Sequence, residues 1–141
     1  MELFASPMAC SLASHITALE AGLPVKVRFV DNKKTDDGGD YLQISAKGYV
    51  PALKLDDGQI LNEGPSVLQY LADRKPEAGL APAWGSVERY HLIDMLNWAV
   101  FLKVDLAKWP TIAAYHQKHL KRPSVVKAMG VEMAERQRRA A

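Results

Sequence analysis

The sequence predicts an α/β fold in which a domain of mixed strands and helices precedes a shortened all-helical part. Up to about residue 75, short apolar runs alternate with helical patterns and turn residues, whereas beyond residue 86 the apolar patterns have helical spacing. The segment between them, residues 76–84, contains prolines and a glycine and is typical of a linker. We therefore expect one domain over residues 1–76 and a helical domain over residues 86–141.

The first domain is predicted to begin with a β-α-β unit. Residues 3–5 read as a short buried strand, residues 11–21 as a helix that ends at Gly22, and residues 25–30 as a second strand. Residues 32–40 are rich in Lys, Asp and Gly, so we expect an exposed loop there.

A β-hairpin and a helix are predicted to complete this domain. Residues 52–55 and 59–61 flank the pair Asp57-Gly58, a strong signal for a two-residue hairpin turn. A helix follows, from residue 62 or 63 to about residue 73, because its apolar side chains have the spacing of one buried face.

The second part is predicted to be entirely helical. Residues 86–103 keep helical spacing throughout and suggest one continuous helix. Pro110 suits the first position of a second helix, which runs to about Leu120, and Pro123 suits the first position of a third.

Composition excludes several classes of function. The formal charge is +2 with acidic and basic residues interleaved, so we expect no nucleic-acid partner, and we interpret Arg136, Arg138 and Arg139 as a solvated tail. No apolar run reaches the roughly 18 residues of a membrane-spanning helix, and no charged and apolar leader pattern opens the chain. We therefore expect a soluble cytoplasmic protein with no membrane partner.

The sequence contains a single cysteine, Cys10, which excludes an intramolecular disulfide and a CxxC redox or zinc pair. We expect no metal cofactor. Cys10 follows a predicted strand and precedes a predicted helix, where free backbone N–H groups and the helix dipole favour a thiolate. It is a candidate nucleophile, and the alternative is a small buried residue that packs the helix. His15 does not stack over Cys10 on a helix of 3.6 residues per turn, so we interpret it as structural.

Five motifs in this order closely resemble the bacterial beta-class glutathione S-transferases, and the resemblance covers the first domain nearly end to end. The motifs are Cys10-Ser11-Leu12-Ala13-Ser14-His15, Lys47-Gly48-Tyr49-Val50-Pro51-Ala52-Leu53, Asp56-Asp57-Gly58, Glu63-Gly64-Pro65 and Gln69-Tyr70-Leu71-Ala72-Asp73. The resemblance implies a thioredoxin-like N-terminal domain, glutathione as the substrate, and transfer of glutathione to small electrophiles.

The resemblance also implies roles for individual residues. Cys10 would face the glutathione sulfur, Val50 would pair its backbone with the cysteinyl unit, and Pro51 would follow a cis bond. Glu63 would hold the γ-glutamyl ammonium and the Gly64 N–H its carboxylate. A hydroxyl-bearing residue is frequent in the family at the position of Gly64, so one hydrogen bond worth about 1 kcal/mol is missing here.

Two further contacts follow from the same resemblance. Lys34, or Lys33 in the alternative register of the loop, would meet the glycyl carboxylate, and Asn97 would reach glutathione bound to the partner subunit. From the residues alone, Glu63 reads equally as an acid that complements the helix dipole, and the two lysines as solvated loop charges.

The helical part departs from the family. Residues 89–98 resemble the start of the family's fourth helix, and residues 102–106 and 113–125 resemble its last two helices, but roughly sixty residues between these matches are missing. The missing part would include the family's active-site histidine. Because uncovering one face of the domain could cost several kcal/mol, we expect a homodimer, with or without exchanged helices.

Three functions remain compatible with this sequence. The first is a glutathione transferase that acts on small electrophiles and serves detoxification. The second is a glutathione-dependent thiol-disulfide activity through Cys10, which needs less of the helical domain. The third is a non-catalytic glutathione-binding module.

Overall fold

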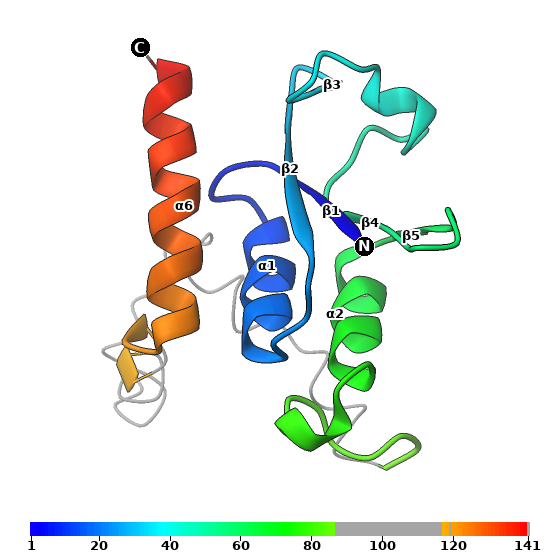
Figure 1. Cartoon of the computed structure of the whole chain (residues 1–141), viewed down its shortest axis with the longest axis vertical. Helices are drawn as coiled ribbons and strands as arrows, with labels where there is room; N and C mark the ends of the chain where they lie inside the picture. Colours follow the sequence, from blue (N-terminus) through cyan, green and yellow to red (C-terminus); the bar gives the residue numbers. More distant parts are fainter. Residues whose placement is uncertain (87–116, 119, 141) are drawn as a thin grey trace, which may run out of the picture.

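The computed structural model describes residues 1–86, 117–118 and 120–140. Its centre is a five-stranded sheet of order β3-β2-β1-β4-β5 (Figure 1). The strands are β1 (Glu2–Ala5), β2 (Lys26–Asp31), β3 (Lys34–Thr35), β4 (Ala52–Lys54) and β5 (Ile60–Asn62). β1 runs parallel to β2 and antiparallel to β4, and the other neighbours are antiparallel.

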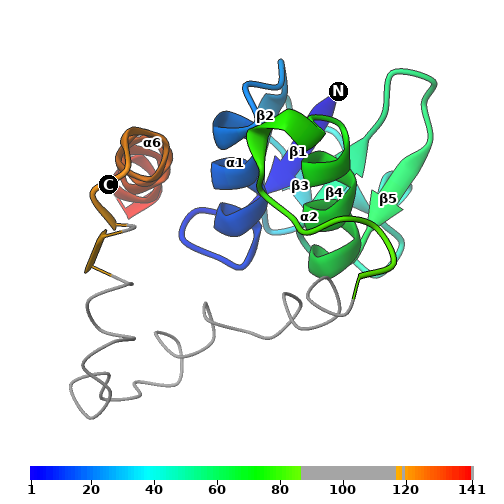
Figure 2. The same cartoon turned by 90° about the horizontal axis from the view of Figure 1, so that it is seen from below.

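Two helices cover one face of this sheet. Helix α1 (Ser11–Glu20) connects β1 to its parallel neighbour β2, a connection that a short hairpin cannot make. Helix α2 (Gly64–Asp73) follows β5, and Figure 2 shows α1 and α2 side by side against the sheet. The core between helices and sheet consists of Leu3, Ala18, Leu53, Val67 and Leu71.

A smaller core lies on the opposite face of the sheet. Phe4 and Val30 pack there with Tyr41, which belongs to a 3-10 turn (Tyr41–Gln43) and is fully buried. The rings of Phe4 and Tyr41 lie 5.7 Å apart. The Tyr41 side chain of this turn therefore covers Phe4 and Val30 on the face of the sheet opposite the helices.

Most of the predicted elements of this part are confirmed. The β-α-β unit is present, β4 and β5 pair antiparallel around Asp57-Gly58, and α2 begins one residue after Glu63. The predicted helices over residues 86–103 and 110–120 lie outside the described residues, apart from Ser86, Gln117, Lys118 and Leu120.

The expectation of an exposed segment over residues 32–40 is confirmed for every residue except Thr35, but part of the segment is a strand rather than a loop. Lys34 and Thr35 form β3, which pairs antiparallel with Val30 and Asp31, and Thr35 is buried. The cause is charge pairing: Arg28 on β2 contacts the carboxylates of Asp36 and Asp37 at 2.5 Å each. The acidic residues that suggested a solvated loop thus hold it against the sheet.

The last described helix, α6 (Pro123–Ala140), lies beside α1 in both views of the chain (Figures 1 and 2). Its start at Pro123 is as predicted. At that end Arg122 and Ser124 bind the Glu20 carboxylate of α1. None of the helices among the described residues combines the length and the apolar composition that crossing a membrane requires.

The other end of α6 corrects the interpretation of the terminal arginines. Arg139 donates to the Val30 carbonyl at 3.0 Å and lies 5.9 Å from the centre of the Phe29 ring. Its side chain is only 19 % exposed, whereas that of Arg138 is 69 % exposed. Arg139 is therefore a docking residue of α6 rather than part of a solvated tail.

Between these two ends, Glu132 buries its carboxylate completely. Its Oε2 accepts the Met8 backbone N–H at 2.8 Å, and its Oε1 lies 3.1 Å from His15 Nδ1. When Glu132 is ionised its oxygens only accept, and His15 Nδ1 is then the donor in this contact. His15 is buried on α1, which agrees with its interpretation as a structural residue.

We predict that Glu132→Ala lowers the free energy of unfolding by about 3 kcal/mol, because it leaves the Met8 N–H and His15 without their acceptor inside the protein. Urea unfolding followed by circular dichroism measures this loss. Glu77→Ala, which removes an exposed glutamate, is the control and should change stability by less than about 0.5 kcal/mol. A loss below about 1 kcal/mol for Glu132→Ala would contradict the prediction.

Candidate functional site

Cys10 is solvent-exposed and occupies the N-cap position of α1. The loop before it is closed by Ser11, whose hydroxyl accepts the Ser6 N–H at 3.1 Å and donates to the Ser6 carbonyl at 3.2 Å. Met8 in this loop has φ 59°, a left-handed conformation that costs a non-glycine residue roughly 1 kcal/mol or more. The exposed thiol excludes the alternative of a buried packing residue.

The thiol faces the loop that precedes β4. Cys10 Sγ donates to the Val50 carbonyl oxygen at 3.2 Å. The bond between Val50 and Pro51 is cis, as expected. Within the described part of the chain, the Val50 N–H has no hydrogen-bond partner, so it can donate to an extended ligand lying beside this loop.

The buried side chain of Tyr41 holds the loop before β4 in place. Its hydroxyl donates to the Tyr49 carbonyl at 2.7 Å, and the Ser45 hydroxyl donates to the same oxygen at 3.4 Å. Burial raises the pKa of Tyr41, so the hydroxyl keeps its proton for this bond well above neutral pH. The backbone of the residue next to Val50 is thus fixed by a side chain from the 3-10 turn.

The start of α2 forms the other end of the site. Glu63 precedes the helix with φ 72°, and its exposed carboxylate lies 3.3 Å from Lys47 Nζ. Gly64 lies against Pro51, because a Cβ built on Gly64 would be 4.0 Å from Pro51 Cδ. The N-terminus of α2 and the loop of Val50 therefore meet at the cis bond, which brings Val50, Pro51, Glu63 and Gly64 together.

The side chains of the two candidate lysines, Lys33 and Lys34, lie in different places. The Lys33 side chain lies beside Gly48, with Cε 3.5 Å from the position of a Cβ built there. Gly48 is two residues before Val50, so Lys33 is next to the loop that carries Val50. Lys34, in contrast, belongs to β3 and lines a different groove.

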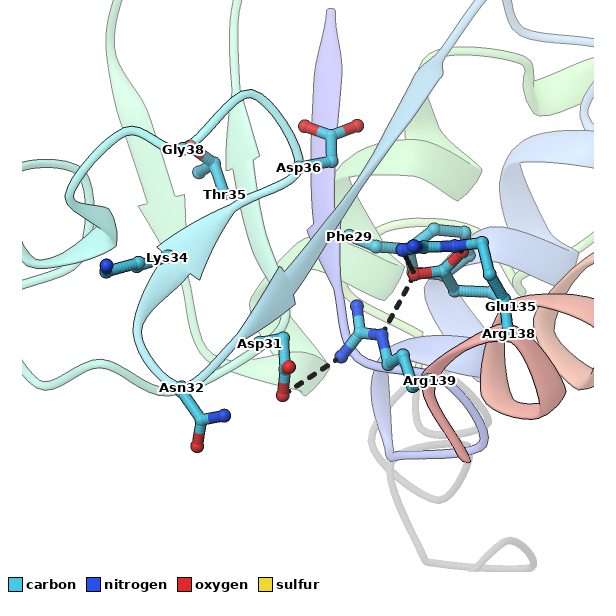
Figure 3. Close-up of a pocket in the computed structure, with 10 residues that line it drawn as sticks. All are labelled: Phe29, Asp31, Asn32, Lys34, Thr35, Asp36, Gly38, Glu135, Arg138 and Arg139. Atoms are coloured by element: carbon cyan, nitrogen blue, oxygen red, sulfur yellow. Dashed lines mark hydrogen bonds and ion pairs between the residues drawn. The ribbon is translucent and has the colours of Figure 1, made fainter. Parts of the chain in front are cut away.

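That groove, of about 540 Å³, lies between the β2–β3 region and the end of α6 (Figure 3). Figure 3 shows Arg139 reaching across it to Asp31 and Glu135. The Arg138 guanidinium, aided by Arg139, holds the pKa of Glu135 at about 2. Cys10, Val50 and Glu63 do not line this groove, and much of its charge is internally paired.

The structure provides no position for Asn97 and no candidate metal site. Asn97 lies outside the described residues, as do the three histidines beyond His15. Among the residues that the structure describes, no group of three or more His, Cys, Asp and Glu side chains could hold a metal ion.

Sequence reasoning missed three side chains that shape this site: Glu132, Tyr41 and Lys47. Glu132 shares the buried face of α6 with Val125 and Ala128, and an acid at such spacing is the signal that could have found it. Lys47 belongs to the motif of residues 47–53, but the sequence analysis assigned it no role. Tyr41 followed the polar loop, and nothing local in the sequence indicated its burial.

The chain matches the family model "Glutathione S-transferase, N-terminal domain" over residues 7–74. It is 47% identical over 100 residues to glutathione S-transferase GstA of Escherichia coli O157:H7, which is 70% of this chain and 50% of that protein. The chain thus spans about half the length of the curated relatives it matches.

Solved structures resemble the chain over a longer stretch. A sphingomonad glutathione S-transferase complexed with glutathione has a TM-score of 0.83 at 31% identity, with 94% of this chain and 98% of that chain covered. A beta-class glutathione S-transferase of Sphingomonas chungbukensis has a TM-score of 0.82 at 30% identity, with the same coverage. The fold is therefore the expected thioredoxin-like sheet followed by a short helical part.

We predict that Tyr41→Phe lowers the free energy of unfolding by about 1 kcal/mol, because the Tyr49 carbonyl loses its shorter hydrogen bond. Tyr70→Phe is the matched control: among the described residues the Tyr70 hydroxyl has no hydrogen bond, so its removal should leave stability unchanged. Parallel urea titrations of the two variants measure the difference, and equal stabilities would refute the role assigned to Tyr41.

Proposed function

The chain belongs to the glutathione S-transferase family, and from this membership we propose that it binds glutathione and transfers it to small electrophilic substrates. One observation carries the proposal: the exposed Cys10 thiol at the start of α1 lies 3.2 Å from the carbonyl of Val50, which precedes a cis proline. A solved relative is complexed with glutathione, which supports the same ligand for this chain.

In the proposed complex, the glutathione backbone lies along Val50 beside Pro51, and its sulfur lies next to Cys10. Glu63 holds the γ-glutamyl ammonium, and the Gly64 N–H binds the adjacent carboxylate. The contact of Gly64 with Pro51 and the position of Glu63 at the N-cap of α2 support these roles. The N-terminus of α1 favours the thiolate form of glutathione. That thiolate attacks an electrophilic carbon, the leaving group departs with its bonding electrons, and the thiol proton goes to solvent.

The glycyl carboxylate is proposed to bind a lysine of the β2–β3 connection. Lys34 is the candidate that the motif register gives, whereas the position of the Lys33 side chain beside Gly48 supports Lys33. Asn97 of a partner subunit completes the proposed contacts. The proposed organisation is a glutathione-binding domain over residues 1–76 and a helical domain over residues 86–141, acting in the cytoplasm in detoxification.

A second candidate function is thiol-disulfide exchange, and the exposure of Cys10 favours it. The Cys10 thiolate attacks the glutathione sulfur of a mixed disulfide, so that a new S–S bond forms while the old one breaks and the released thiolate takes up a proton. A glutathione thiolate then attacks this new disulfide, which yields oxidised glutathione and restores Cys10. The step requires only the residues around Cys10 and Val50.

We predict that the wild-type protein binds glutathione in calorimetry and conjugates it to a chromogenic aryl halide. Cys10→Ala should retain binding within about tenfold, because the contacts of Val50 and Glu63 remain, but should lose turnover of a glutathione mixed disulfide. Cys10→Ser is the matched variant that keeps the size of the side chain.

Each outcome of these assays has one meaning. Binding with aryl-halide turnover supports the transferase. Binding without that turnover, but with Cys10-dependent disulfide exchange, replaces the transferase with the second candidate. No glutathione binding by the wild-type protein would refute both.

We also propose that the chain is a homodimer, with or without exchanged helices. Apolar side chains on α6 remain exposed: Val126 is 58 %, Val131 44 % and Met133 48 % exposed. Val126 and Met133 are two helical turns apart and therefore share a face that a second subunit would cover.

Light scattering at micromolar concentration is expected to detect a monodisperse dimer. Val126→Asp should raise the fraction of monomer, because it adds a charge to the apolar face of α6. Gln43→Asp, which adds the same charge at an exposed residue of the 3-10 turn, should not. A monodisperse wild-type monomer would contradict the proposal.

A further inference from the structure

Lys47 and Glu63 form an ion pair across the mouth of the proposed glutathione site. Lys47 Nζ lies 3.3 Å from Glu63 Oε1, and the two side chains are 73 % and 66 % exposed. An exposed pair of this kind is worth about 0 to 1 kcal/mol, so a charged ligand can open it at little cost. The contact joins the loop before Pro51 to the start of α2, the two segments that meet at the cis bond.

The residues at the start of α2, from Glu63 to Pro65, have no side chain that donates a hydrogen bond to an anion. Gly64 has no side chain, Pro65 has no N–H to donate, and Glu63 makes no capping hydrogen bond with its side chain. A carboxylate at this point would therefore rely on backbone N–H groups of the first turn. Among the described residues, Lys47 is the cation that pairs with Glu63 and so brings a positive charge to this end of the site.

The γ-glutamyl end of glutathione carries an ammonium and a carboxylate on the same carbon. If Glu63 alone recognised the ammonium, the ligand would break the Lys47–Glu63 pair and leave Lys47 without a partner. A zwitterion can instead insert between the two side chains, with its ammonium on Glu63 and its carboxylate on Lys47. One exposed ion pair is then exchanged for two, with no change in net charge.

Resting on the proposed function, we propose that Lys47 is a specificity-determining ligand of the γ-glutamyl carboxylate. In the free protein Lys47 is held by Glu63, and in the complex it turns to the carboxylate that the Gly64 N–H also binds. Lys47 thereby selects ligands that carry both charges of an amino acid at this end, and it supplies the charge that the bare Gly64 position lacks.

Calorimetry with two ligands tests this role. The second ligand is a glutathione analogue in which 4-aminobutyryl replaces the γ-glutamyl unit, so that the ammonium remains and the carboxylate is lost. Lys47→Gln should weaken glutathione binding about three- to fivefold and leave the affinity for the analogue unchanged. The preference of the protein for glutathione over the analogue should shrink by the same factor.

The control is Lys75→Gln, which removes an exposed lysine that also pairs with a glutamate, Glu77, at 3.2 Å. It should leave both affinities unchanged. Unchanged glutathione binding in Lys47→Gln would overturn the proposal, and so would tighter binding of both ligands, which would make Lys47 only a competitor for Glu63. If the wild-type protein binds no glutathione, the proposed function itself fails together with this inference.

Discussion

The buried carboxylate of Glu132 is the contact on which the geometry around Cys10 depends. A carboxylate with no exposed surface is stable only where donors replace the water it has lost, and here these donors are the Met8 N–H and His15. Met8 in turn holds a left-handed conformation that a free loop would relax. The docking of α6 and the shape of the loop before the thiol are therefore coupled through Glu132, which contacts both Met8 and His15.

The fold around this contact was largely predictable because its determinants are local. The turn at Asp57-Gly58, the helix that ends before Gly22 and the start of α6 at Pro123 each follow from neighbouring residues. β3 was missed because the acids after it do not remain solvated charges but contact Arg28 of the neighbouring strand β2. Local composition cannot reveal such a pairing, since the same acids are equally typical of a solvated loop.

The same distinction separates the site residues that were found from those that were missed. Cys10, Val50, Pro51 and Glu63 stand in short motifs whose order is visible along the chain. The contacts of Glu132 with Met8 and His15 span 124 and 117 residues, and only the docking of α6 creates them. The divergence of Lys33 and Lys34 comes from the turn between β2 and β3, because Lys33 lies in that turn with φ 62° whereas Lys34 pairs with Asp31 in β3.

The groups proposed to bind the two reactants lie in different parts of the chain. The described candidate contacts for glutathione lie between residues 10 and 64, whereas an electrophile would depend on the helical part that is shorter than in the family. Holding both reactants in a reactive geometry provides a large share of the rate enhancement of a bimolecular reaction, but activating one thiolate does not require it. The selectivity of the proposed transferase among electrophiles therefore depends on the helical part, whereas the proposed activation of glutathione depends on the first domain. The second proposed function, thiol-disulfide exchange, uses the Cys10 sulfur as the nucleophile, so the protein groups proposed for it lie within the first domain.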